Sequence, residues 1–124
     1  MRTMRTTDSF PYRGSVIRIA LDPTIGTEIK KTRACVVVSN DIANEFSPQL
    51  TVVPITSYYP RKAAIPVCVD VPSGEGGLTK RSIINCSQIR TIDKTRMRGD
   101  VLGVLSRTTM DKVSTALKIH LALS

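Results

Sequence analysis

The run Leu50-Thr51-Val52-Val53-Pro54-Ile55-Thr56 indicates the kind of fold that this chain forms. Valine, isoleucine and threonine are enriched in strands, so the run predicts a strand that ends at Thr56. Pro54 donates no ladder hydrogen bond, and we expect it at a sheet edge or a bulge. The preceding apolar run, residues 34–40, has the same character and follows Arg33. If the two strand ends lie side by side, a permanent cation and a hydroxyl meet in one pocket.

Further strand-like runs lie on both sides of this pair. They cover residues 16–21, 65–71, 82–89 and 100–105. Segments rich in turn-forming residues separate the runs: a long first loop from residue 22, then residues 44–48, 58–62 and 73–77. Short strands with little intervening helix predict a mainly β fold, an antiparallel and highly curved sheet or small barrel.

Helix is expected mainly at the C-terminus. Ser106 or Thr108 can cap a segment that runs to about residue 123, in which apolar residues recur at spacings of three and four. The only histidine, His120, falls in this apolar stripe, so we expect a packed, hydrogen-bonded side chain and no catalytic role. A short helical turn is predicted at residues 93–97.

Length and charge describe a basic chain of one domain. The 124 residues carry 18 lysines and arginines against 10 aspartates and glutamates, for a net charge of +8 and a pI near 9.9. We expect residues 1–10 to form a flexible arm and residues 11–124 to form the domain. The charge predicts a polyanionic partner, and a well-solvated surface is the alternative explanation.

The three cysteines, Cys35, Cys68 and Cys86, include no C-x-x-C pair, so no metal site is indicated. An odd number of thiols in apolar runs is typical of a reducing, cytoplasmic environment. We find no secretory signal and no membrane-length apolar segment. The sequence therefore predicts a cytoplasmic protein with no metal, no cofactor and no membrane partner.

With histidine assigned to packing, acid–base chemistry would proceed without its usual residue. Phosphoryl chemistry on RNA suits such a protein, because the substrate supplies the nucleophile, a 2′-hydroxyl. The protein then needs mainly to position it and to neutralise the charge that develops at phosphorus.

Several fragments in a fixed order are similar to one known family. They are Arg13-Gly14, Leu21-Asp22-Pro23, Gly26-Thr27-Glu28, Thr32-Arg33, Val36-Val37-Val38-Ser39-Asn40-Asp41, Val53-Pro54-Ile55-Thr56, Gly74-Glu75-Gly76-Gly77-Leu78 and Gln88-Ile89-Arg90-Thr91-Ile92-Asp93-Lys94. Together they resemble the MazF/PemK toxins, sequence-specific endoribonucleases (mRNA interferases) of bacterial toxin–antitoxin pairs. The likeness extends over residues 13–123.

The resemblance implies an SH3-like antiparallel barrel of the CcdB/MazF type with a C-terminal helix, assembled as a homodimer. It also implies metal-independent cleavage of single-stranded RNA (mRNA), which leaves a 2′,3′-cyclic phosphate and a 5′-hydroxyl, and inhibition by an acidic antitoxin. In the family an arginine and a threonine carry catalysis, and these positions match Arg33 and Thr56. Glu28 is the remaining candidate for the general base.

Residues with expected RNA-binding roles surround this pair. Family positions near the groove match Arg13, Asn40, Gln88 and Arg90, while Lys30 and Lys31 add charge at its mouth. Tyr58 with Arg61 and Lys62 combines a ring face with cations, as stacking and backbone attraction require. Turn hydrogen bonds, ion pairing or an exposed loop would also explain several of these residues.

Two other functions fit the same fold. A gyrase-poisoning toxin of the CcdB type would leave RNA intact, although the chain has no tryptophan to serve as a terminal anchor. A non-catalytic RNA-binding module would bind RNA without cleaving it.

Overall fold

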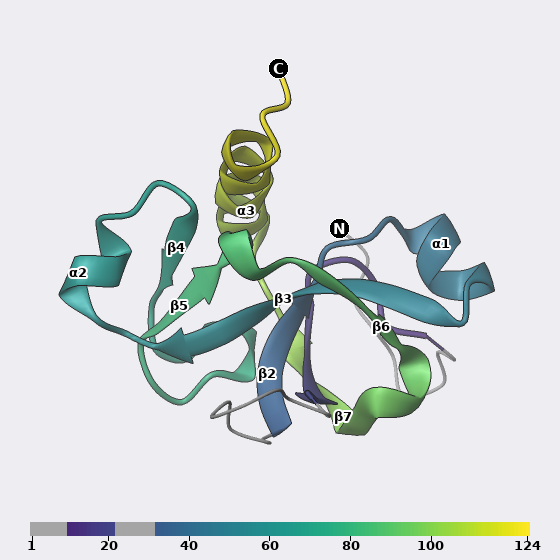
Figure 1. Ribbon diagram of the computed structural model, residues 1–124. Helices are drawn as coiled ribbons and strands as arrows, with labels where there is room; N and C mark the ends of the chain where they lie inside the picture. Colours follow the sequence, from purple (N-terminus) through teal and green to yellow (C-terminus); the bar gives the residue numbers. More distant parts are fainter. Residues whose placement is uncertain (1–9, 22–31) are drawn as a thin grey trace, which may run out of the picture.

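The computed structural model describes residues 10–21 and 32–124, which form a strongly curved antiparallel sheet with a helix packed against it (Figure 1). Within these residues the sheet has seven strands, and six of them follow the order β4-β5-β3-β2-β1-β7, with β6 paired to β3. The strands are β1 (Ser15–Ala20), β2 (Thr32–Val37), β3 (Gln49–Ser57), β4 (Cys68–Val71), β5 (Ser82–Asn85), β6 (Arg90–Asp93) and β7 (Met97–Val104).

Helical segments connect and cover the strands. The α-helices are α1 (Asp41–Phe46), α2 (Pro60–Ala63) and α3 (Arg107–His120), and the 3-10 turns are η1 (Glu75–Gly77), η2 (Cys86–Gln88) and η3 (Lys94–Arg96). The helices α1 and α2 lie at opposite ends of β3, and α3 stands against the end of the sheet that holds β4 and β5 (Figure 1).

The long strand β3 is central and has a neighbour on each side. It pairs with β2 along one edge, and along the other with β6 as far as Val52 and with β5 from Ile55 onward. Pro54 falls between those two pairings, where no partner strand requires its missing N–H. Pro54 therefore lies at a local edge, as expected, although β3 itself is a central strand that changes partners at this point.

Two apolar clusters lie on opposite faces of the sheet, because neighbouring side chains on a strand point to opposite sides. The helix-side cluster joins Val36, Val53 and Ile84 to Met110 and Val113 of α3. The inner cluster is enclosed by the curved strands and consists of Ile17, Ile19, Cys35, Val37, Leu50, Val52 and Ile92. Strand alternation thus assigns each buried apolar residue of β2 and β3 to one of two cores.

The C-terminal helix forms where the capping signal predicted it. The Ser106 side chain accepts a hydrogen bond from the Thr109 N–H, and Met110, Val113 and Ala116 bury the apolar stripe. The helix ends at His120, which is exposed. The expectation of a packed histidine is wrong, because the buried stripe ends before the last turn.

The structure corrects two local predictions around β2 and β6. The strand predicted over residues 34–40 ends at Val37. The loop predicted at 44–48 is partly helical, because helix α1 extends to Phe46. The Asn40 side chain accepts a hydrogen bond from the Ala43 N–H and begins that helix, a capping role that strand propensity does not reveal. Residues 90–93 form strand β6, whereas the helical turn predicted at 93–97 is present as η3.

The strand predicted at residues 65–71 is shorter and begins at Cys68. The strand predicted at 82–89 ends at Asn85, whose side chain accepts from the Ser87 N–H and turns the chain into η2. In the part of the chain that the structure describes, no helix has both the length and the apolar character to cross a membrane.

Candidate functional site

The pairing of β2 with β3 brings the ends of the two strands together. Cys35 lies opposite Pro54, and the same register holds at the two preceding positions of β3. The pairing ends at Cys35 and Pro54, so Arg33 and Thr56 each lie two residues beyond its last pair, on neighbouring strands. Side chains two apart on a strand share a face, so both belong to the face that carries the inner cluster. A half-buried guanidinium and a hydroxyl thus continue this apolar surface at its edge.

Arg90 joins this face from the other side of β3. It lies opposite Val52 on β6, which places its side chain on the same face as the Cys35 side chain. Burial raises the pKa of the Cys35 thiol to about 12, and the positive charges of Arg90 and Arg33 act in the opposite direction. Both guanidinium groups are therefore close enough to one buried sulfur atom to act on its ionisation.

The Thr56 hydroxyl is an unusual polar group on this face. Its Oγ1 atom is buried and, among the described residues, has no hydrogen-bond partner. A buried hydroxyl without a partner costs about 1–3 kcal/mol relative to a satisfied one. The arrangement can therefore offer a hydrogen bond and two cations to a negatively charged group that reaches this face.

The other candidates named from the sequence lie in different surroundings. Gln88 ends η2 and is exposed, two residues before the exposed Arg90. Asn40 is exposed, but its side-chain oxygen caps α1. Arg61 and Lys62 are exposed on α2. Of these four residues, only Gln88 is close in the chain to a residue on the same face as Arg33, namely Arg90.

Arg13 is held by the protein itself. Its Nε donates to the Val38 carbonyl at 3.0 Å, and its Nη2 donates to the Ser114 hydroxyl of α3 at 3.0 Å. Its backbone N–H donates to an Asp41 carboxylate oxygen at 2.7 Å. These bonds join the start of β1 to α1 and α3, which is a structural task.

Three predicted residues, Glu28, Lys30 and Lys31, lie outside the described residues, as do residues 1–9 of the expected arm. Within residues 10–21 and 32–124, no group of three or more His, Cys, Asp or Glu residues has the arrangement of a metal site.

One cluster was not anticipated from the sequence. Arg81 lies over the Tyr58 ring, with its guanidinium carbon 3.7 Å from the ring centroid, and forms a bidentate ion pair with Asp70. Asp70 and Arg81 lie on either side of the β4–β5 connection. The turn predicted at residues 73–77 could have indicated this pair. A hairpin at that turn brings the strands on either side of it together, and Asp70 and Arg81 lie on those strands or next to them.

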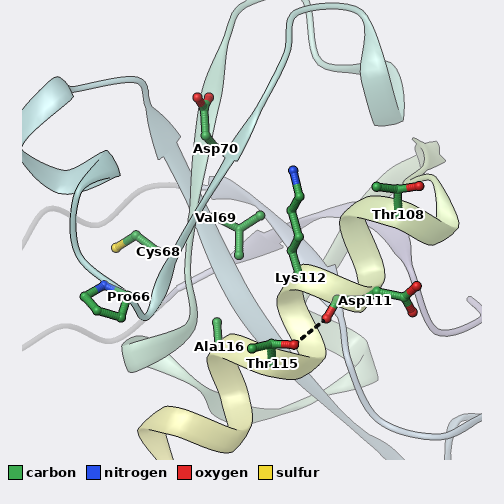
Figure 2. Close-up of a pocket in the computed structure, with 9 residues that line it drawn as sticks. All are labelled: Pro66, Cys68, Val69, Asp70, Thr108, Asp111, Lys112, Thr115 and Ala116. Atoms are coloured by element: carbon green, nitrogen blue, oxygen red, sulfur yellow. Dashed lines mark hydrogen bonds between the residues drawn. The ribbon is translucent and has the colours of Figure 1, made fainter.

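A cavity adjoins this cluster, because Asp70 also lines it. Figure 2 shows it between β4 and α3, with a volume of about 460 Å³. Its lining residues are Pro66, Cys68, Val69, Asp70, Thr108, Asp111, Lys112, Thr115 and Ala116. None of these is among the catalytic or RNA-binding residues expected from the sequence.

Comparisons with known proteins agree with this architecture. Residues 12–121 match the family described as PemK-like, MazF-like toxin of type II toxin-antitoxin system. The chain is 41% identical over 111 residues to Endoribonuclease EndoA of Bacillus subtilis, covering 90% of this chain and 94% of that protein. It is 38% identical over 112 residues to Endoribonuclease MazF of Staphylococcus epidermidis, covering 90% and 92%.

A solved structure shows the same fold. An endoribonuclease in complex with its cognate antitoxin from mycobacterial species has a TM-score of 0.74 and 28% identity, covering 92% of this chain and 97% of that one. The fold and the family match define a toxin of a type II toxin–antitoxin system. The chain belongs to the PemK-like, MazF-like family. The predicted fold class and family are confirmed.

Proposed function

We propose that this protein is an endoribonuclease toxin that cleaves single-stranded RNA at the face formed by Arg33, Thr56 and Arg90. The observation that carries the proposal is the β2–β3 register, which favours one face of the sheet for a cation and for a hydroxyl that has no partner among residues 10–21 and 32–124. Membership of the toxin family supports it, as do relatives named endoribonucleases at 38–41% identity. These comparisons do not favour the gyrase-poisoning alternative.

The reaction proposed here is an in-line attack of a ribose 2′-hydroxyl on the adjacent phosphate. The new bond joins the 2′-oxygen to phosphorus, and the bond from phosphorus to the 5′-oxygen breaks. A 2′,3′-cyclic phosphate results, and the departing 5′-oxygen takes up a proton from water to become a 5′-hydroxyl. The substrate supplies its own nucleophile, so the reaction needs no metal-bound water.

Each residue has a role that follows from its chemistry. Arg33 stays protonated at any accessible pH and stabilises the extra negative charge on the phosphoryl oxygens. The Thr56 hydroxyl donates a hydrogen bond to one of those oxygens, which gives the buried Oγ1 a partner. Arg90 supplies a second positive charge on the same face. Glu28 remains the proposed acceptor of the 2′-hydroxyl proton.

The partners belong to the same proposal. A homodimer in the cytoplasm, inhibited by an acidic antitoxin, fits the family and the net charge of +8. An acidic segment would compete with RNA for the same cations. We expect its affinity to fall steeply as salt is raised, because several screened ion pairs weaken together. A salt-independent affinity would contradict this part of the proposal.

The direct experiment incubates the purified protein with a long unstructured mRNA in EDTA and maps the new 5′ ends. We expect cleavage at a recurring short sequence, with 5′-hydroxyl and cyclic phosphate termini. The Arg33→Ala variant should leave the RNA intact. RNA that is bound but never cut would favour the non-catalytic module, and uncut RNA together with trapped gyrase would favour a CcdB-type toxin.

A further inference from the structure

Arg81 makes several close contacts although it is exposed. Its Nε donates to Asp70 Oδ1 at 3.0 Å, its Nη2 donates to Asp70 Oδ2 at 2.5 Å, and its guanidinium carbon lies 3.7 Å from the centroid of the Tyr58 ring. The side chain of Arg81 nevertheless remains 53% exposed. The Tyr58 ring therefore covers one face of the planar guanidinium, and part of the Arg81 side chain remains open to solvent.

Strand register places this group on the same face as Thr56. Thr56 lies opposite Ile83, and Ile83 lies opposite Asp70, so their side chains form one row across β3, β5 and β4. The next row holds Tyr58 and Arg81, whose backbones are joined by a hydrogen bond of 3.2 Å. Residues two apart on a strand are separated by about 7 Å, so the row that holds Tyr58 and Arg81 lies about that far from Thr56.

The contacts of Arg81 with Asp70 and Tyr58 contribute only modestly to stability. Ion pairs between exposed side chains contribute little to folding, about 0–1 kcal/mol. The pair with Asp70 also neutralises much of the positive charge, which weakens attraction for a phosphate. The contacts with Asp70 and Tyr58, together called the clamp, fix the orientation of the planar Arg81 guanidinium. Such planes stack on unpaired RNA bases.

We propose that the open face of Arg81 is the stacking platform for the base of a nucleotide next to the cleaved phosphate, which makes Arg81 an RNA-positioning residue. The proposal rests on the proposed RNA-cleaving function. Tyr58 supports the guanidinium from behind, and Asp70 holds its edge. Because the clamp orders Arg81 before RNA binds, little side-chain entropy is lost when the base stacks.

The test uses short RNAs that span one mapped cleavage site, each with a single abasic nucleotide at one of the positions flanking the cut. With the unchanged protein, one adjacent position should be sensitive, with kcat/KM reduced about 10-fold when the base is missing. Arg81→Ala should cleave the intact RNA about 10-fold less efficiently, and the abasic nucleotide should then have less than about a 2-fold effect.

Two further variants separate stacking from charge and from folding. Arg81→Lys keeps the charge but has no planar group, so it should lose the sensitivity as Arg81→Ala does. Lys80→Ala removes a neighbouring exposed cation and should retain the full abasic penalty. An unchanged penalty at every position in both Arg81 variants would overturn the inference. If the unchanged protein cuts no RNA, the proposed function itself fails.

Discussion

Cys35 of β2 lies directly opposite Pro54 of β3, and this pair aligns the ends of two strands that are distant in sequence. Arg33 and Thr56 each lie two residues beyond this last pair, on the same face of the sheet as Cys35 and Pro54. The pair also marks where β3 leaves β6 and begins to pair with β5. The candidate site therefore lies where one central strand changes partners, next to the buried Cys35 thiol.

The Thr56→Val substitution should separate stability from activity. Valine keeps the shape of the side chain and removes a buried Oγ1 that has no partner among the described residues. We expect the free energy of unfolding to stay the same or to increase by about 1 kcal/mol. We expect RNA cleavage to fall on the order of 100-fold. Urea unfolding and single-turnover cleavage measure the two quantities.

Thr51→Val is a matched control on the same strand. The Thr51 hydroxyl lies 3.3 Å from that of Thr91, so its removal should cost about 0.5–1.5 kcal/mol of stability and leave cleavage nearly unchanged. If Thr56→Val were as active as the unchanged protein, the hydroxyl would have no part in the reaction.

The Arg33→Ala substitution should abolish most of the cleavage. Removing a group that stabilises charge in a transition state commonly costs 100-fold to 1,000-fold in rate, and we expect a loss of about that size. Arg18→Ala is the control: Arg18 is an exposed arginine of β1 that lies opposite Ala34, on the other face of the sheet. Equal losses in the two variants would indicate that only net charge matters.

Arg13→Ala should affect folding more than cleavage. The substitution removes the hydrogen bonds from the guanidinium to Val38 and Ser114, and we expect a loss of about 1–3 kcal/mol in unfolding free energy. Ser114→Ala removes one of these partners and should cost less. A variant of unchanged stability that binds RNA weakly would instead support the substrate-binding role expected from the sequence.

Gly77→Ala should be far more damaging than Gly99→Ala. Both glycines have a φ of +75°, so both alanines carry a similar backbone strain, about 1–2 kcal/mol. A Cβ at Gly77 would lie 2.1 Å from the Leu102 carbonyl oxygen, whereas one at Gly99 meets nothing within 4 Å. Thermal unfolding should show a much lower Tm for Gly77→Ala. Equal Tm values would contradict the close packing of η1 on β7.

Alkaline pH should destabilise the protein partly through Cys35. Burial raises the pKa of this thiol from 9.0 to about 12, so the folded state holds a proton that the unfolded chain releases. The stabilisation is complete below pH 9 and is lost as pH rises toward 12, at up to about 1.4 kcal/mol per pH unit. Urea unfolding should therefore show a shallower loss for Cys35→Ala than for the unchanged protein. Parallel pH profiles would show that the thiol is not effectively buried.

Local patterns predicted most of the elements but not their ends. Val, Ile and Thr runs predicted six of the strands, and Ser106 predicted the start of α3. Helix α1 and strand β6 were missed because side-chain caps and a partner strand, not propensity, decide them. His120 was assigned to the core because periodicity does not reveal where packing stops.

The sequence alone determined the class of fold, the family and the residue types of the candidate site, because strand propensity, helix capping and ordered motifs are properties of neighbouring residues. Only the tertiary structure decided which side chains are already engaged. Arg13 binds Ser114, which is 101 residues away, and Arg81 meets Asp70 across a strand pair. Such contacts depend on the register and curvature of the whole sheet, which no local pattern encodes.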